Sequence, residues 1–144
     1  MNWLPDADTI SDRRSERGSL VGIHTALSHA RASVLVVAWD MPFVSSALLQ
    51  LIADRATSAA CAAIPDGPDG LEPFCAAYTP ACLPHIERAI ESGDLRLRRI
   101  IAELPAIEVI SRREIRAIGD PARLFFNVNS AEQLAEAERL AAAQ

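Results

Sequence analysis

The sequence predicts an α/β fold in which helices cover both faces of a mainly parallel sheet. Residues 34–38 form a short apolar run that is rich in Val and ends at Asp40 and Pro42, which is typical of a strand buried on both faces. On either side of this run, the apolar residues recur at helical spacing. The chain of 144 residues, half of them hydrophobic, suits a single domain over residues 1–144 with its own core.

The segment before the first helix is polar, and in it Ile10 can end a short strand with Asp12 at its tip. From Ser19, a plausible N-cap, a helical pattern runs to Ala30. Gly22 falls in the first turn of this helix, where glycine costs up to ~1 kcal/mol relative to alanine. That cost indicates either close packing or a close ligand.

The middle of the chain alternates in the same way. A helix is expected from Ser45 or Ser46 to about residue 56, followed by a strand over residues 59–64 and a turn-rich loop over residues 65–70. Residues 71–78 predict a second strand that pairs with the first across this loop. Pro73 lies inside that strand and indicates an irregular or edge position.

Helices dominate the rest of the chain. Thr79 and Pro80 predict a helix start, with an end at Gly93, and Asp94 can cap the next helix. The arginines of that next helix are expected on a solvated face: Arg96, Arg98 and Arg99. A strand is expected over residues 106–110, irregular structure over residues 111–121, and a last helix that begins with a capping box of Ser130 and Gln133.

Composition argues against several classes of protein. The net charge is −5 and all 14 basic residues are arginine, an acidic balance that argues against nucleic acid and anionic membranes as partners. No apolar run approaches the ~18 residues of a membrane span, and no signal-peptide pattern opens the chain. The three cysteines form no CxxC pair, so zinc is not expected, and free thiols in a reducing cytoplasm are the default.

Asp40 is the residue most suggestive of chemistry. In open parallel α/β sheets, ligands bind in the crevice beyond the carboxyl ends of the strands. A carboxylate at that point can hold a hard cation and, through it, phosphates. The alternative is that Asp40 only opens an Asp-x-Pro turn. The phosphate-cradle patterns GxxxxGK[ST] and GxGxxG are absent from the sequence.

Four motifs in order resemble the molybdenum cofactor guanylyltransferase family. Asp12 is followed by a Gly-Ser-Leu-Val-Gly turn from Gly18 to Gly22, and the strand ends in Asp40-Met-Pro. An Asn-Val-Asn segment, Asn127 to Asn129, precedes the last helix, and residues 72–78 are similar to the Glu-Pro…Ala-x-Tyr strand of the family. The resemblance implies a Rossmann-like three-layer nucleotidyltransferase fold that transfers GMP from GTP to molybdopterin-bound molybdenum and releases pyrophosphate.

The resemblance also implies a role for each matching residue. Asp40 would hold Mg²⁺ between the protein and the triphosphate, and Asp12 would contact the nucleotide. Gly18 and Gly22 would let the backbone approach the nucleotide at a helix N-terminus. Asn127 and Asn129 would line the side of the molybdopterin-type acceptor, although turn formation and helix capping are alternative roles for them.

The chain departs from the family in one major respect. Family members open with a strand and a Gly-rich loop that wraps the triphosphate, whereas this chain begins after both. We therefore expect an N-terminally shortened member whose sheet lacks its first strand and associates through exposed edges. Alone it should transfer GMP slowly. Two alternatives remain: a cytidylyltransferase with the same fold, and a non-catalytic remnant that binds a partner or itself.

Overall fold

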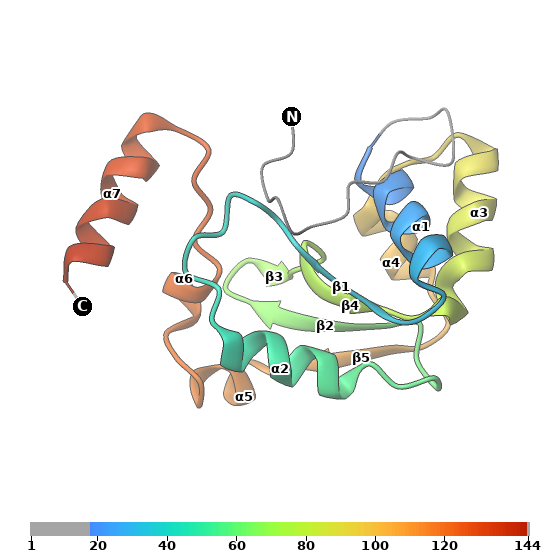
Figure 1. Cartoon of the computed structure of the whole chain (residues 1–144), viewed down its shortest axis with the longest axis horizontal. Coiled ribbons are helices and arrows are strands. Elements are labelled where there is room, and N and C mark those ends of the chain that lie inside the picture. The colour runs from blue at the N-terminus through green and yellow to red at the C-terminus, as the bar shows by residue number, and fades with distance from the viewer. Residues whose placement is uncertain (1–17, 144) are drawn as a thin grey trace.

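The described part of the chain, residues 18–143 of the computed structural model, is a mixed sheet between two layers of helices (Figure 1). The predicted strand that ends near Asp12, and Asp12 itself, lie outside these residues. The strands are β1 (Val34–Val37), β2 (Ala62–Gly67), β3 (Gly70–Leu71), β4 (Cys75–Tyr78) and β5 (Ile107–Ile110). The helices are α1 (Ser19–Ala30), α2 (Ser46–Arg55), η1 (Pro80–Cys82, a 3-10 helix), α3 (Leu83–Ser92), α4 (Leu97–Glu103), α5 (Arg112–Arg116), α6 (Pro121–Leu124) and α7 (Ala131–Ala142).

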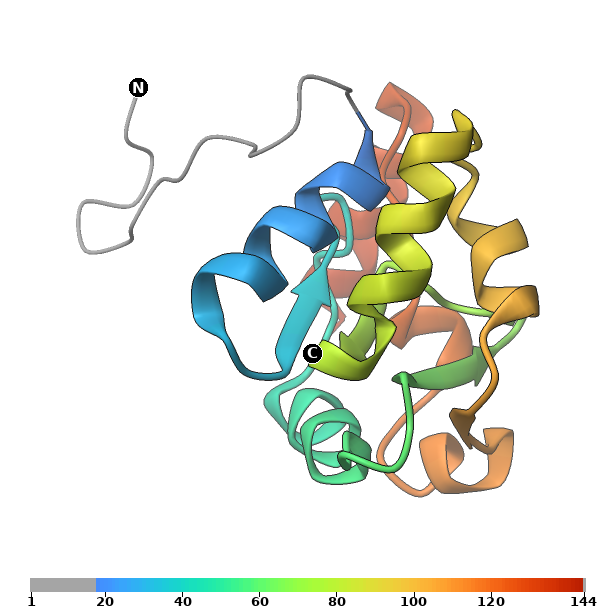
Figure 2. The ribbon, with the colours of Figure 1, turned by 90° about the vertical axis from the view of Figure 1, so that its right-hand side faces the viewer.

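The sheet separates two hydrophobic clusters. Along β4, Ala76 and Tyr78 belong to the cluster beneath α1, α3 and α4, whereas Cys75 and Ala77 belong to the cluster that contacts α2 and α5. Figure 2 shows α1, α3 and α4 on one side of the sheet and α2 and α5 on the other. The predicted three-layer α/β architecture is therefore confirmed, and its cause is a strand whose alternate side chains are buried on opposite faces.

The expectation of a mainly parallel sheet is not confirmed, because β4 runs antiparallel to both β1 and β2. Within the described residues, β2 and β5 form the parallel pair. Residues 68–74 join β2 to β4, and so short a connection cannot make the crossover that parallel neighbours need. Strands β1, β2 and β5 nevertheless share one direction, so their carboxyl ends lie along the same edge of the sheet.

The strand that returns from the β2 hairpin is interrupted at residues 72–74. Gly67 pairs with Gly70, but beyond Leu71 the pairing with β2 stops. It resumes only at Ala77, whereas Cys75 pairs with Val37 of β1. Pro73 has no amide to donate to the ladder. Its carbonyl accepts a hydrogen bond of 2.6 Å from the buried Tyr78 hydroxyl, and the Phe74 carbonyl accepts one of 2.8 Å from the Ala38 amide. The irregularity predicted at Pro73 is thus a fixed bulge.

Several predicted helix ends are confirmed. Ser45 caps α2 by accepting a hydrogen bond from the Leu48 amide, and Gly93 ends α3 in the left-handed conformation with φ of 80°. Helix α1 begins at Ser19, so its N-cap is Gly18 and not Ser19 as predicted. The backbone of Gly18 has φ of 133°, a conformation that L side chains rarely adopt.

Other predictions of local structure were wrong. Residues 111–121 are not irregular, because they contain α5 and the start of α6. The missed signal is a capping box in which Ser111 and Glu114 bond each other's backbone amides. The strand expected over residues 59–64 is β2, which begins later and continues through Pro65 to Gly67, leaving only residues 68 and 69 for the turn.

The C-terminal helix α7 lies apart from the helices of both layers, at the opposite end of the molecule from α3 (Figure 1). It begins at a Ser130 side chain that accepts from the Gln133 amide, as predicted. None of the helices between residues 18 and 143, α7 included, has both the length and the apolar character that a bilayer-spanning helix needs.

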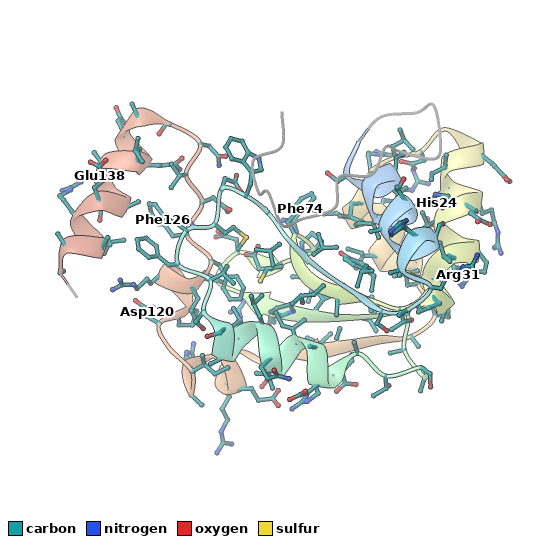
Figure 3. The ribbon with its side chains drawn as sticks, viewed as in Figure 1. His24, Arg31, Phe74, Asp120, Phe126 and Glu138 are labelled. Atoms are coloured by element: carbon teal, nitrogen blue, oxygen red, sulfur yellow. The ribbon has the colours of Figure 1, made fainter. Side chains whose placement is uncertain are left out.

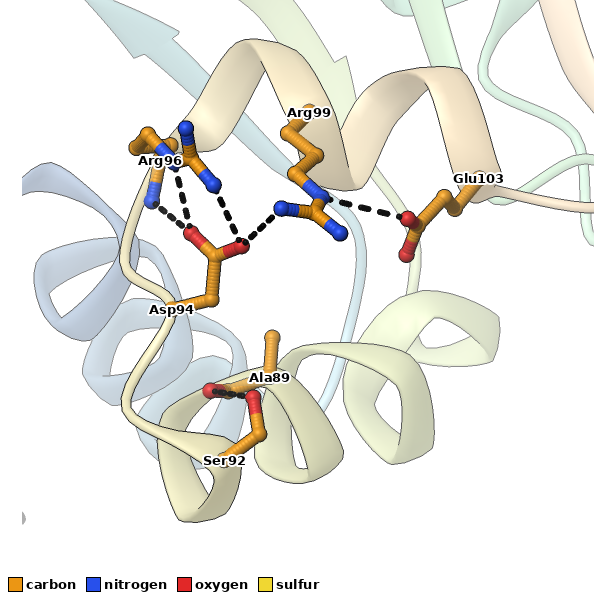
Figure 4. Close-up of polar contacts among 6 residues, drawn as sticks. All are labelled: Ala89, Ser92, Asp94, Arg96, Arg99 and Glu103. Carbon is orange, nitrogen blue, oxygen red and sulfur yellow. Dashed lines mark hydrogen bonds and ion pairs between the residues drawn. The ribbon is translucent and has the colours of Figure 1, made fainter.

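A polar network fixes the start of α4 (Figure 4). Asp94 does not cap this helix as predicted, because the helix begins at Leu97. Its carboxylate instead accepts hydrogen bonds from the Arg96 amide at 3.2 Å and from the Arg96 guanidinium at 3.0 and 3.1 Å. Arg99 lies 3.2 Å from the same carboxylate and 3.4 Å from Glu103.

The network predicts how stability depends on pH. The hydrogen bonds from Arg96 lower the pKa of Asp94 from 3.8 to about 2, and Arg99 adds to this. A carboxyl group whose pKa is depressed by folding stabilises the protein above its ordinary pKa and loses that contribution as pH falls through the folded value. The difference in unfolding free energy between the parent and Asp94→Asn should therefore shrink between pH 4 and pH 2. Urea titrations across this range measure it, and a constant difference would contradict the assignment.

The Tyr78 hydroxyl should contribute measurably to stability. Tyr78→Phe leaves the Pro73 carbonyl without its partner inside the core, which should lower the unfolding free energy by about 1–3 kcal/mol. Ser92→Ala is the matched control, because it removes an exposed hydroxyl that also donates to a backbone carbonyl. Its effect should stay within about 0.5 kcal/mol. Equal effects in urea titrations would show that the bulge does not depend on Tyr78.

Candidate active site

A pocket of about 520 Å³ opens at the carboxyl end of β1, on the face of the sheet that α1 and α4 cover. Four of the residues singled out in the sequence line it together: Gly22, Asp40, Asn127 and Asn129. Gly18 precedes Ser19, which also lines the pocket. Asp12 lies outside the described residues. The pocket therefore unites residues from the first helix, the end of the first strand and the segment before α7.

One backbone hydrogen bond brings the C-terminal segment to Asp40. The Val128 amide donates to the Asp40 carbonyl at 2.8 Å, which places an asparagine on each side of the contact. The Asn129 amide in turn donates to the Gln133 side chain at 2.7 Å. Gln133 thus reaches back one residue further than the predicted capping box, and it fixes the backbone beside Asp40.

Gly22 faces the open pocket. A methyl group built at Gly22 would meet no atom within 4 Å, whereas one at Gly67 would come within 2.7 Å of the Glu72 side chain. Close packing therefore explains the glycine at position 67 but not the one at position 22. Of the two explanations that the sequence left open for Gly22, a close ligand is the one that agrees with this empty space.

Two charged residues of the pocket were not predicted. Glu72 comes from the bulge, and Arg98 comes from α4, where its guanidinium donates to the Leu71 carbonyl at 3.1 Å. Burial raises the pKa of the Glu72 carboxyl, and the positive charge of Arg98 partly opposes this. Arg98 had been expected on a solvated face. It is exposed, but its position on α4 brings it to the bulge, a long-range contact that helical spacing does not reveal.

Two aromatic side chains also line the pocket. Trp39 directly precedes Asp40, and Phe74 comes from the bulge. Figure 3 shows Phe74 between the end of β1 and α1. The sequence had placed Trp39 only as part of a strand end, and no spacing signal connected it with Phe74.

The polar residues of the pocket suit a magnesium ion that is bound together with a phosphate ligand. Mg²⁺ prefers oxygen ligands, keeps several waters and is usually held by one or two carboxylates plus substrate phosphates. Asp40 and Glu72 offer carboxylates, and Asn127 and Asn129 offer amide oxygens. Between residues 18 and 143, no cluster of three or more His, Cys, Asp or Glu forms a metal cage. The donor set therefore fits a cation shared with a ligand.

Comparison with solved structures defines the class of the fold. The crystal structure of molybdopterin-guanine dinucleotide biosynthesis protein A from Archaeoglobus fulgidus matches with a TM-score of 0.83 and 31% identity, over 94% of this chain and 68% of that one. A protein from Aquifex aeolicus shares the fold at a TM-score of 0.65 and 21% identity, over 83% of this chain and 60% of that one. The chain thus has a nucleotidyltransferase fold, with its pocket at the carboxyl end of β1.

Sequence comparison gives the family. The family model described as the MobA-like NTP transferase domain matches residues 3–109. The chain is 33% identical over 123 residues to the molybdenum cofactor guanylyltransferase of Desulfosudis oleivorans, covering 85% of this chain and 60% of that protein. A probable molybdenum cofactor guanylyltransferase of Flavobacterium johnsoniae is 30% identical, over 92% of this chain and 67% of that protein. The chain belongs to the MobA-like NTP transferase family, and it spans about 60% of the length of the first relatives it matches.

The empty space at Gly22 predicts opposite effects on stability and binding. Gly22→Ala should raise the unfolding free energy by about 0.5–1 kcal/mol, because alanine is the better helix former and meets no clash. The added methyl group enters the pocket, so a ligand of this pocket, with GTP and Mg²⁺ as the probe, should bind more weakly. Thermal unfolding and calorimetric titration measure the two effects. Gly67→Ala is the contrasting variant, and it should destabilise the fold.

Proposed function

We propose that this chain is a nucleotidyltransferase domain that transfers GMP from GTP to the terminal phosphate of molybdopterin-bound molybdenum. The observation that carries the proposal is that Gly22, Asp40, Asn127 and Asn129 line one pocket, although they come from distant parts of the chain. The names of the relatives support the choice of guanine nucleotide and acceptor. An acceptor phosphate oxygen attacks the α-phosphorus of GTP, and the bond to the β-phosphate oxygen breaks to release pyrophosphate.

Asp40 is the residue proposed to hold Mg²⁺, with Glu72 as a second carboxylate of the same pocket. When bound, Mg²⁺ offsets negative charge at the α-phosphate and at the leaving pyrophosphate. Arg98 contributes a positive charge to the pocket from α4, where it can attract and orient an anionic substrate. Its hydrogen bond to the Leu71 carbonyl holds the guanidinium in place beforehand.

The first turn of α1 is proposed to receive the nucleotide. With no side chain at Gly22, the helix backbone is open to the pocket, and the N-terminus of a helix favours anions and polar edges. Asn127 and Asn129 are proposed to bind the acceptor, since their segment is held beside Asp40 by the Val128 hydrogen bond. Asp12 keeps the role that the family resemblance implies, contact with the nucleotide.

The choice of base and the place of action are further parts of the proposal. A cytidylyltransferase would share this fold and the same carboxylate, and parallel Mg²⁺-dependent titrations with GTP and CTP separate the two.

A cytoplasmic location is consistent with the three buried free thiols at Cys61, Cys75 and Cys82. Burial raises the pKa of Cys75 and of Cys82 to about 12, so neither thiol is suited to nucleophilic chemistry at neutral pH.

One observation favours the alternative of a non-catalytic, self-associating chain. Within the described residues, β1 pairs on one side only, with β4, and its Leu35 and Val37 side chains are each 40% exposed. An apolar edge strand can pair with another chain. Light scattering combined with GTP titration separates the two functions, since a remnant associates without binding nucleotide.

The decisive variant is Asp40→Asn. Removal of the carboxylate charge should abolish the difference between GTP binding with Mg²⁺ and with EDTA, and in an active form of the protein it should slow transfer by about 100-fold or more. Asp54→Asn is the matched control, because it removes an exposed carboxylate on α2, across the sheet from the pocket. If Asp40→Asn keeps the full magnesium dependence, Asp40 is a turn residue.

A further inference from the structure

Trp39 is an exposed aromatic residue that the proposed roles leave unused. Its side chain is 97% exposed, the most exposed of the large hydrophobic residues between positions 18 and 143. A tryptophan so fully in water buries none of its large apolar surface, so it contributes little to folding. It nevertheless lines the pocket and directly precedes Asp40. An exposed ring at this position is available to a ligand.

Phe74 supplies a second ring to the same pocket. The register that pairs Val37 with Cys75 places Phe74 opposite Ala38, and the Ala38 amide donates to the Phe74 carbonyl at 2.8 Å. Phe74 therefore lies across the strand end from the residue before Trp39. It is 37% exposed, although the bulge that carries it is held by Tyr78. The backbone that presents this ring is thus fixed before any ligand arrives.

Apolar side chains also line the pocket. Ile23, Val36 and Ala38 line the same pocket, and Met41 follows Asp40. The pocket thus combines an apolar wall with the polar groups of Asp40 and the two asparagines. Ligand pockets typically pair such a wall with a few polar groups that fix orientation, and 520 Å³ lies within the usual range of their volumes.

We propose that Trp39 and Phe74 form an aromatic wall on which the planar fused-ring heterocycle of a substrate stacks. This inference rests on the proposed function, which supplies two such heterocycles, the guanine of GTP and the pterin of the acceptor. Both have flat faces that stack on aromatic side chains, while their charged phosphates lie toward Asp40. Trp39 then selects for the ring, and Asp40 for the metal-bound phosphates.

Fluorescence of Trp39 tests the wall directly. The chain has two tryptophans, so in Trp3→Phe the emission comes from Trp39 alone. We expect GTP or a free pterin to quench this emission in a saturable way, because each brings a ring onto the indole. Inorganic tripolyphosphate with Mg²⁺ carries the phosphates without a ring, and it should leave the emission nearly unchanged. Equal quenching by tripolyphosphate would overturn the proposal.

Variants of both rings give the energetic test. Calorimetric titration should show binding of the stacked heterocycle weakened roughly 5- to 140-fold by Trp39→Leu, which stays apolar but loses the ring. Trp39→Phe should retain most of the affinity, and Phe74→Leu should weaken it in the same direction. Leu134→Ala is the control, since it removes another exposed apolar side chain, on α7. Because Trp39 is 97% exposed, its variants should unfold at the same temperature as the parent.

The outcomes separate this inference from the proposed function. If GTP binds with magnesium dependence and Trp39→Leu binds it and the pterin as tightly as the parent, the wall is refuted while the transferase assignment stands. If the pterin binds through Trp39 but GTP does not bind, the wall is supported and the use of GTP is refuted. Absence of binding by either heterocycle overturns the wall.

Discussion

The hydrogen bond from the Val128 amide to the Asp40 carbonyl is the contact on which the pocket depends. It joins the end of β1 to a segment that is distant in the sequence and that leads into α7. The Phe43 and Phe126 rings, whose centroids lie 6.3 Å apart, join the same two segments, whereas α7 itself lies apart from the helical layers (Figure 1). The hydrogen bond from the Asn129 amide to the Gln133 side chain then joins the first turns of α7 to the same segment.

The bulge at residues 72–74 makes the second half of the pocket. Pro73 cannot donate to the ladder, so the returning strand leaves β2 after the hydrogen bond from the Glu72 amide to the Pro65 carbonyl, and Glu72 and Phe74 line the pocket. Two hydrogen bonds to the carbonyls of Pro73 and Phe74 replace the lost ladder contacts. A residue that weakens a regular strand therefore produces the irregular backbone that the site needs.

Local rules predicted the parts of this protein that depend on neighbours in sequence. The strand before Asp40, the serine caps at Ser45 and Ser130 and the end of α3 at Gly93 follow from side chains within a few residues of each element. The expectation that this strand is buried on both faces was wrong, because Leu35 and Val37 of β1 are each 40% exposed. The reversed direction of β4 could also have been inferred from the short connection to β2, but the apolar pattern of a doubly covered strand is the same in either direction. The capping box at Ser111 was present in the sequence and was overlooked.

The pocket was predictable only where motifs marked it. The family motifs identified Gly22, Asp40, Asn127 and Asn129, and the structure places them together. Glu72 and Phe74 lie in the segment that resembles the Glu-Pro…Ala-x-Tyr strand of the family, but that motif was not interpreted as part of the site, and Arg98 belongs to no motif. Their meeting depends on the pairing of β1 with β4 and on the contact of Arg98 with the Leu71 carbonyl. These are tertiary contacts, which spacing along one element does not encode.

The sheet divides the chain into two compartments, and we expect selection on the two to differ. Side chains that line the pocket, such as Ile23 and Val36, come from the face beneath α1, whereas Leu48, Ile52 and Ile115 pack on the opposite face, away from any ligand. On that second face a substitution need only preserve volume and apolarity to be neutral. Among related chains, residues of α2 and α5 should therefore be substituted faster than residues of α1 and of the strand it covers. A single domain should then show two rates of amino-acid substitution.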